Sequence, residues 1–157
     1  MSGAGAPRFE LLGMTDVRVA IIASSWHDVV MNGLIDGAVR TCESAGVQYQ
    51  LVRVPGSFEL GVAAMRAAKS GVDAVVALGV VIRGGTPHFD FVCTAATDAL
   101  NRVALDTGVP VGFGLLTCDT EEQALARAGL WHSTESKGQE AAEAALMTVQ
   151  TLRSVGW

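Results

Sequence analysis

The side chains best suited to chemistry lie in one stretch, residues 83–90, which read Arg-Gly-Gly-Thr-Pro-His-Phe-Asp. The two glycines let the backbone turn and approach a ligand closely, and Thr86 offers a hydroxyl. Backbone amides beside a helix start can hold a phosphate. His88 carries an imidazole, the side chain that titrates near neutral pH and can serve as a general acid or base. These residues predict an anion-binding turn beside a proton-transfer group, although a plain β-to-α turn with a surface histidine would also contain them.

Three other kinds of site fit this sequence less well. Residues 79–86 have the spacing of a phosphate-binding P-loop, but the lysine is missing and the first glycine falls inside a strand pattern. His88 and Asp90 stand two apart with no third ligand nearby, which disfavours a metal site. Residues 56–59 lack the second glycine of a nucleophile elbow, so we expect Ser57 to cap a helix and not to attack a substrate.

Length and composition favour one compact domain. The chain has 157 residues, of which 50% are apolar and 17% charged, enough to bury a sizeable core. We expect a disordered N-terminal tail at residues 1–13 and a single domain at residues 14–157. The net charge of −5 and the absence of a basic run disfavour a nucleic-acid partner. Positive mean hydropathy indicates apolar surface that contacts between subunits would cover.

The three cysteines, Cys42, Cys93 and Cys118, are odd in number and widely spaced. This pattern indicates neither a disulfide framework nor a zinc site, and we expect small core residues. The N-terminus has no basic start followed by an apolar signal core, and the longest apolar run is too short for a membrane span. The expected compartment is therefore the cytoplasm, with no membrane partner.

Apolar runs that alternate with helical patterns predict a parallel α/β sheet. Strands are expected at 17–24, 49–54, 74–82 and 109–117, and helices at 27–45, 58–69, 89–106, 120–129 and 137–153. Right-handed crossovers then give a single-domain three-layer α/β/α sandwich with the flavodoxin-like strand order 2-1-3-4. Ligands of such sheets bind beyond the carboxyl ends of the strands, which here are residues 24–26, 54–59, 83–88 and 117–119.

Helix signals add details to this prediction. A stripe of Val30, Leu34, Ala38 and Cys42 marks the core side of the first helix. Thr120 and Gln123 predict a capping box at the start of the fourth helix, which Gly129 should end. The apolar stripe of the last helix is expected to include Ala141, Ala144, Ala145, Thr148 and Leu152.

Three side chains have both a structural and a functional interpretation. Trp26 follows the first strand, where an indole could stack on a flat heterocycle or simply pack in a core or interface. Arg127, at the end of the fourth helix, could form a terminal ion pair or bind phosphate with its forked donors. Lys137 begins the last helix, where a cation opposes the helix dipole, and this placement favours a ligand or interface role.

Four segments in order, residues 21–26, 54–59, 79–90 and 122–129, followed by Lys137-Gly138, resemble the lumazine synthase family. The resemblance covers about residues 17–152, and the histidine-containing segment is its most specific part. It implies condensation of 5-amino-6-(D-ribitylamino)uracil with 3,4-dihydroxy-2-butanone 4-phosphate to 6,7-dimethyl-8-ribityllumazine, the penultimate step of riboflavin biosynthesis. Phosphate and water are released, and no metal or organic cofactor is implied.

Positions that match the family's motifs imply roles for individual residues. For the pyrimidine, the resemblance implies stacking by Trp26, contact of the ring and ribityl chain with Ser57, Phe58 and Glu59, and main-chain contact of the uracil edge with Val80, Val81 and Ile82. For the ketone, it implies that Gly85, Thr86 and Arg127 bind the phosphate. Proton transfer is implied for His88. Phe113 and Arg127 are expected to reach the site from a neighbouring subunit. Lys137 is a possible accessory residue.

Two departures from the family pattern affect these expectations. The position of Gly85 often has a side chain in the family, so phosphate contact there can involve only backbone. Residues 130–136 are longer than the short, glycine-rich turn of members that form sixty-subunit capsids, which favours a homopentamer. A non-catalytic flavin- or lumazine-binding protein and a shell-forming protein are the competing functions, and association with riboflavin synthase is left open.

Overall fold

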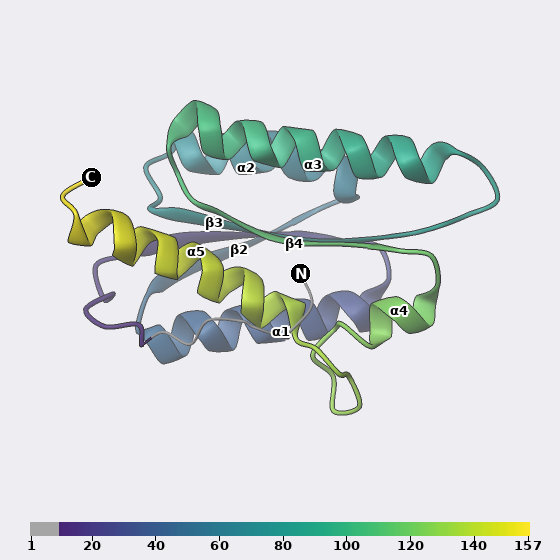
Figure 1. Cartoon of the computed structure of the whole chain (residues 1–157), viewed down its shortest axis with the longest axis horizontal. Helices are drawn as coiled ribbons and strands as arrows, with labels where there is room; N and C mark the ends of the chain where they lie inside the picture. The colour runs from purple at the N-terminus through teal and green to yellow at the C-terminus, as the bar shows by residue number, and fades with distance from the viewer. Residues whose placement is uncertain (1–9) are drawn as a thin grey trace.

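The computed structural model describes residues 10–157 and contains a four-stranded sheet in the order β2-β1-β3-β4 (Figure 1). The strands are β1 (Arg18–Ser24), β2 (Gln48–Val54), β3 (Ala74–Ile82) and β4 (Val111–Cys118). Every neighbouring pair is parallel. The predicted α/β class and the order 2-1-3-4 are therefore confirmed.

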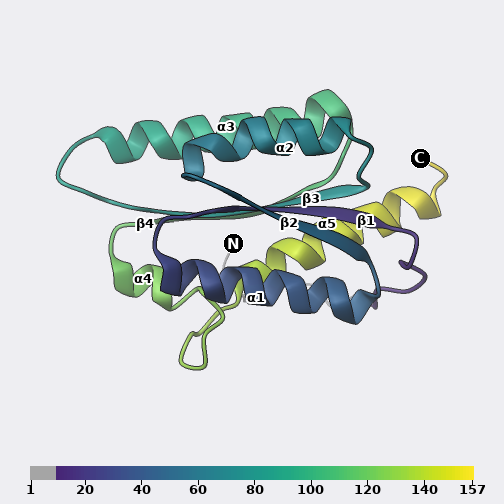
Figure 2. The ribbon, with the colours of Figure 1, turned by 180° about the vertical axis from the view of Figure 1, so that it is seen from behind.

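Helices cover both faces of the sheet. On one face lie α1 (Asp28–Ala45), α4 (Glu121–Leu125) and α5 (Lys137–Ser154). On the other lie α2 (Leu60–Lys69), α3 (His88–Thr107) and the short 3₁₀ helix η1 (Ser57–Glu59). Figures 1 and 2 show these two helical layers from opposite sides. The strands all end at one edge, called the carboxyl edge below, as parallel strands joined by crossover helices must.

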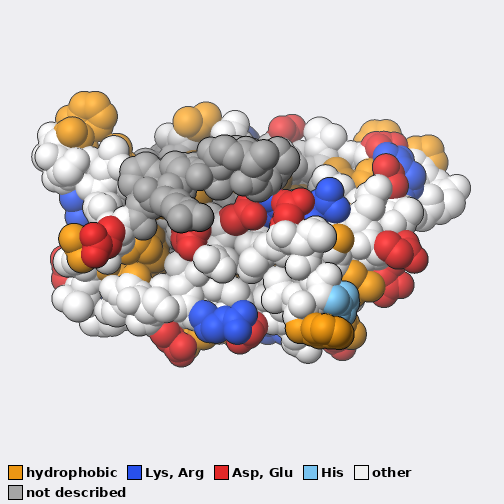
Figure 3. Space-filling model, turned by 60° about the horizontal axis from the view of Figure 1, so that its bottom comes forward, with side chains coloured by type: hydrophobic (Ala, Val, Ile, Leu, Met, Phe, Trp, Pro, Cys, Tyr) orange, Lys and Arg blue, Asp and Glu red, His pale blue; other side chains and the backbone are white. Residues whose placement is uncertain are grey.

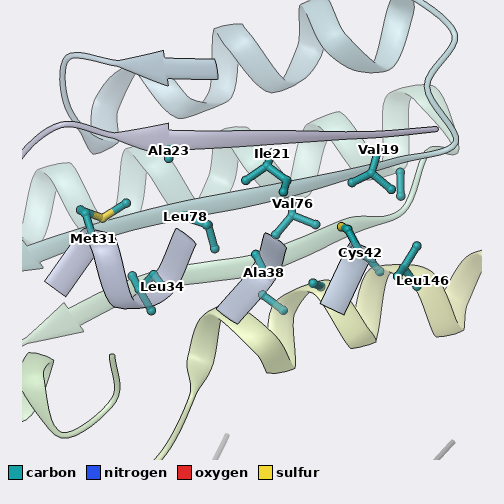
Figure 4. Close-up of a cluster of buried hydrophobic side chains, with 14 of the residues drawn as sticks. Val19, Ile21, Ala23, Met31, Leu34, Ala38, Cys42, Val76, Leu78 and Leu146 are labelled. Atoms are coloured by element: carbon teal, nitrogen blue, oxygen red, sulfur yellow. The ribbon is translucent and has the colours of Figure 1, made fainter. Parts of the chain in front are cut away.

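A separate hydrophobic core fills the space on each side of the sheet. Alternate residues of the central strands point to opposite faces, so Val76 and Leu78 pack toward α1 and α5 while Val75 and Ala77 pack toward α2 and α3. The predicted stripe of α1 is buried as expected. Figure 4 shows three of its members, Leu34, Ala38 and Cys42, beneath β1 and β3.

The apolar stripe predicted for α5 is partly wrong. Ala144 and Thr148 are exposed, and the buried positions are Gly138, Ala141, Ala142, Ala145, Leu146 and Val149. The helix packs against both α1 and β4. Its buried face is therefore wider than the predicted stripe and is rotated relative to it. Alanines lie on both sides of this helix, so composition alone does not distinguish the two faces.

Two predicted helix ends also need correction. Helix α4 ends at Leu125 and not at Gly129. Thr120 Oγ1 accepts the expected bond from the Gln123 amide at 3.3 Å, but Gln123 Oε1 accepts from the Asp119 amide, 2.8 Å away, so the capping box is displaced by one residue.

Ser57 is not a helix cap either. It is the first residue of η1, and Gly56 holds the N-cap position. The Gly56 amide donates to Glu59 Oε2 at 2.9 Å, which is the bond from the N-cap amide to an N3 carboxylate that a capping box contains.

Surface and termini complete the description. Figure 3 shows the face that includes α1 and α5, where basic side chains lie among acidic ones and form no large patch on the part that grey atoms leave visible.

Within residues 10–157, no helix is long and apolar enough to cross a bilayer, and no group of three or more acidic, His or Cys side chains could hold a metal ion. Residues 1–9 of the predicted tail lie outside the described part of the chain. Gln150 of α5 hydrogen-bonds to Glu10 O and to the Leu12 amide.

The cysteines are free thiols in the structure. Cys42 and Cys118 are buried and Cys93 is partly buried. Burial, with a smaller contribution from Glu43, raises the pKa of Cys42 to about 11. These environments match the expectation of small core residues for Cys42 and Cys118.

Candidate active site

A cavity of about 320 Å³ opens at the carboxyl edge, where β1, β2 and β3 end. It is within the size range of small-molecule sites. The residues that line it are Trp26, His27, Gly56, Ser57, Phe58, Val80, Val81, Ile82, His88 and Val92. The fold thus gathers around one cavity most of the residues predicted for the pyrimidine and for proton transfer. Glu59 does not line it, and its carboxylate instead holds the turn at Gly56.

Trp26 offers an accessible aromatic surface. Its side chain is 68% exposed, although it follows a strand that is buried almost throughout. A Cβ atom built on Gly56 would lie 3.7 Å from Trp26 Cδ1 and Nε1, so the glycine backbone lies against the indole. An exposed indole at a cavity mouth can stack on a flat heterocycle.

The end of β3 presents main-chain groups to the cavity. Its ladder with β1 stops at the pair Ala23↔Leu78, whereas its ladder with β4 continues to Ile82↔Cys118. Backbone groups of Val80 to Ile82 that face the β1 side therefore have no strand partner there. Buried or half-buried amide and carbonyl groups need hydrogen-bond partners, and a planar ring with donors and acceptors along one edge would provide them.

Ser57 connects η1 to this strand. It is buried, and its Oγ lies 3.4 Å from Val80 O, a long hydrogen bond. A Cβ atom on Gly79 would lie only 2.8 Å from Ser57 Oγ. Gly79 therefore serves close packing inside the strand, which agrees with the rejection of a P-loop.

The turn between β3 and α3 leaves open space beside its backbone. Neither Gly84 nor Gly85 has positive φ, and a Cβ atom on either would meet no other atom within 4 Å. Nothing in residues 10–157 thus requires glycine at these positions, and the bare backbone is accessible to a ligand. Thr86 is exposed in the same turn, and His88 is the exposed first residue of α3.

Phe113 and Arg127 lie elsewhere. They line a second cavity of about 380 Å³ beside β4, together with Lys137 and Glu135. Arg127 follows α4, and its Nη1 donates to Gln123 O at 2.9 Å. Within one chain, the predicted phosphate residues Gly85 and Thr86 and the predicted partner residues Phe113 and Arg127 do not share one cavity.

Lys137 is held by two carboxylates. Its Nζ lies 2.7 Å from Glu140 Oε2 and also forms an ion pair with Glu135. Burial alone lowers the pKa of Lys137, but the hydrogen bonds to Glu135 and Glu140 outweigh it and leave the pKa raised. The hydrogen bond from Lys137 lowers the pKa of Glu135 in turn. These contacts fix the start of α5 beside the second cavity.

Sequence reasoning assigned no role to three residues of the first cavity, His27, Gly56 and Val92. His27 is the N-cap of α1 and has left-handed backbone angles, φ 60° and ψ 64°, which are uncommon outside glycine. Its polar side chain directly after Trp26 was the available signal. Val92 stands four residues after His88 on α3, and helical spacing places it on the same face.

Comparison with known proteins identifies the family. The model of the 6,7-dimethyl-8-ribityllumazine synthase family matches residues 16–153. The chain belongs to this family. It is 61% identical to the 6,7-dimethyl-8-ribityllumazine synthase of Streptomyces coelicolor, over 99% of this chain and 97% of that protein.

The synthase of Leifsonia xyli subsp. xyli is also 61% identical to this chain, with 99% of each protein covered. That of Renibacterium salmoninarum is 60% identical over 98% of this chain and all of the relative. Similarity at this level over nearly the full length confirms the resemblance to lumazine synthases and the enzyme class predicted from it.

Proposed function

We infer that the cavity at the carboxyl edge is the pyrimidine half of a lumazine synthase active site. The activity is that of the family: the chain forms 6,7-dimethyl-8-ribityllumazine in riboflavin biosynthesis. The observation that supports the location is the meeting of Trp26, His88 and the unpaired end of β3 around one cavity.

The pyrimidine substrate, 5-amino-6-(D-ribitylamino)uracil, fits these groups by their chemistry. Its ring stacks on Trp26, and its uracil edge hydrogen-bonds to the main chain of Val80 to Ile82. Ser57 and Phe58 contact the ring and the ribityl chain, and Glu59 acts beside them by holding the turn at Gly56. Stacking and edge recognition together fix the plane and the rotation of the ring, so the amine is aimed toward the turn at residues 84–87.

The second substrate, 3,4-dihydroxy-2-butanone 4-phosphate, carries a charged group that suits the turn. Backbone at Gly85 and the Thr86 hydroxyl bind the phosphate, helped by the start of the twenty-residue helix α3. Arg127 adds a forked cation to the phosphate. Because Arg127 and Phe113 lie in a different cavity of the same chain, we assign both to the active site of the next subunit.

Each step of the chemistry moves a proton, and we assign these transfers to His88. The amine attacks the ketone and one water leaves to give an imine. Phosphate then departs, and the ribitylamino nitrogen closes the ring on the remaining carbonyl with loss of a second water. None of these steps requires an electron sink. Aligning the two bound reactants can lower the barrier by up to about 7–11 kcal/mol, and one general acid or base adds on the order of 10²–10⁴-fold.

The test is to mix the purified protein with both substrates and follow lumazine absorbance and fluorescence. We expect product only when both substrates are present. A non-catalytic flavin- or lumazine-binding protein with this fold would bind the product but make none, and that result would reject the proposed function. The cytoplasm remains the expected compartment, and association with riboflavin synthase can be tested by adding that enzyme to the same mixture.

A further inference from the structure

Arg83 has three contacts that neither the sequence motifs nor the proposed chemistry use. It is the first residue after β3. Its Nε donates to Asp119 Oδ1 at 2.7 Å, and its Nη1 donates to Asp90 Oδ1 at 3.3 Å. Its guanidinium carbon lies 4.2 Å from the centre of the Phe89 ring. One side chain thus joins the ends of β3 and β4 to the first turn of α3.

These contacts enclose the turn that carries the proposed phosphate site. Residues 84–87 lie between Arg83 and His88. The side chains of Phe89 and Asp90 extend from the same helical turn as His88. The Arg83 amide also donates to Cys118 O at 2.9 Å. The turn is therefore anchored at both ends by one residue.

The connection continues toward the second cavity. The Asp119 amide donates to Gln123 Oε1 at 2.8 Å, and Gln123 O accepts from Arg127 Nη1 at 2.9 Å. Arg83, Asp119, Gln123 and Arg127 thus form a continuous set of contacts between the turn and the residue assigned to the neighbouring site.

We propose that Arg83 is a positioning residue, which holds residues 84–88 in the geometry that binds the phosphorylated ketone and presents His88 to it. This inference rests on the proposed function. The single positive charge of Arg83 also offsets part of the negative charge of Asp90 and Asp119, two carboxylates that would otherwise weaken phosphate binding at the turn more strongly.

The contacts favour placement of the turn over global stability as the role of Arg83. The side chains of Arg83, Asp90 and Asp119 are 44%, 62% and 62% exposed, and exposed ion pairs stabilise a fold by little. The planar guanidinium can meet two carboxylates and a ring face at once, whereas a lysine offers one point charge. A turn displaced by about 1 Å can slow a reaction on the order of a hundredfold.

The experiment compares Arg83→Met and Arg83→Lys with wild type, and uses Arg102→Met as the matched control. Arg102 is an exposed arginine of α3 whose pair with Asp106 is remote in sequence from the turn. We expect kcat/KM for the ketone phosphate to fall about ten- to a hundredfold in Arg83→Met, with a smaller rise in KM for the pyrimidine. Arg83→Lys should recover only part of the loss, and Arg102→Met should match wild type.

Two further measurements distinguish positioning of the turn from a plain loss of positive charge. Asp119→Ala alone should reproduce much of the loss, and combining it with Arg83→Met should add little, because both remove the same contact. Amide hydrogen exchange at residues 84–88 should be faster in Arg83→Met than in Arg102→Met.

Three results would overturn the inference. They are an Arg83→Met enzyme with the kinetics of Arg102→Met, additive effects of the Arg83 and Asp119 substitutions, and unchanged exchange at residues 84–88. The exchange measurement needs no catalysis, so it decides the inference even if the wild-type protein makes no lumazine, a result that would reject the proposed function.

Discussion

His88 is the residue on which the proposed chemistry most depends. It begins α3 directly after the glycine-rich turn and lines the same cavity as Trp26. Its exposure leaves the imidazole accessible to a bound substrate. Among residues 10–157 it has no ion pair like those of Arg83 or Lys137, so its removal should affect rate and leave the fold intact.

We predict that His88→Ala lowers turnover by about tenfold to a thousandfold while pyrimidine binding stays nearly unchanged. Orientation of the two substrates supplies the remaining rate. Steady-state kinetics would measure this, with His132→Ala in the exposed loop beside Trp131 as the control. A mutant whose turnover equals that of wild type from about pH 6 to about pH 9 would remove His88 from the mechanism.

Trp26 should report directly on ligand binding. An indole that stacks on the lumazine product loses fluorescence, and the chain has three tryptophans. We predict that Trp26→Phe loses most of the quenching that the product causes, while Trp131→Phe keeps it, because Trp131 is 96% exposed and does not line the cavity beside Trp26. Equal quenching in Trp26→Phe and wild type would show that the stacking assignment is wrong.

Sequence reasoning found most of this cavity because its residues adjoin strand ends, which apolar runs mark well. It missed His27 because a left-handed backbone at a helix start leaves no clear signature in a histidine. It also left Arg83 without a role, since the partners Asp90 and Asp119 become neighbours of one guanidinium only after β3 and β4 pair.

At the scale of elements, a prediction was accurate where apolar and polar residues are clearly separated in the sequence of that element. The nine residues of β3 were predicted with correct bounds because a continuous apolar run ends sharply at a charged residue. Helix α5 was placed correctly, but its buried face was not, since small residues occur all round it. Close helix contacts of this kind depend on tertiary packing that a periodicity cannot specify.

The contact between α5 and α1 gives a test at this scale. A Cβ atom on Gly138 would lie 1.9 Å from the carbonyl oxygen of Leu34, which is backbone and cannot rotate away. We predict that Gly138→Ala lowers the free energy of unfolding by about 1–3 kcal/mol, or more if the helices must separate. Urea unfolding at one fixed protein concentration measures it.

Gly84→Ala is the matched control for this prediction. An added Cβ there meets nothing within 4 Å and φ is not positive. The free energy of unfolding should therefore stay the same or rise by about 0.4–1 kcal/mol, because alanine lowers the conformational entropy of the unfolded chain. Equal stability of Gly138→Ala and wild type would mean that α1 and α5 do not pack as closely as described.

At the scale of the whole molecule, the surface indicates assembly. Phe91 and Leu105 of α3 are 72% and 76% exposed, and Phe113 on the edge strand β4 is half exposed. We take these exposed apolar side chains on α3 and on the edge strand β4 as part of the surface that contacts another subunit. A head-to-tail contact that brings β4 of one subunit to the carboxyl edge of the next gives a ring when its rotation closes.

The loop before α5 is relevant to whether pentamers assemble further into a capsid. It projects from the body of the molecule between α4 and α5 (Figure 1). Its base is closed by the bond from the Gly129 amide to Glu135 O, 3.0 Å, and Trp131 is almost fully exposed. We propose that this projecting loop prevents pentamers from approaching one another as they do in a capsid.

We therefore predict a homopentamer of about 80 kDa, five times the subunit mass of 16.3 kDa. Light scattering coupled to size-exclusion chromatography measures it. A particle in the megadalton range would show that the loop does not block further assembly. A stable monomer with full activity would contradict the shared site altogether.

Complementation between two impaired variants tests the shared site most directly. His88→Ala and Arg127→Met each slow every site of their own oligomers, because each removes one of the two side chains from all of them. If each site takes His88 from one subunit and Arg127 from the next, mixed oligomers from co-expression at equal amounts contain wild-type sites at about one interface in four. We predict that lumazine formation by the mixed protein rises to about a quarter of the wild-type rate, far above the sum of the two variants. A mixed protein no more active than that sum would contradict the shared site, and with it the assignment of the two cavities to one reaction.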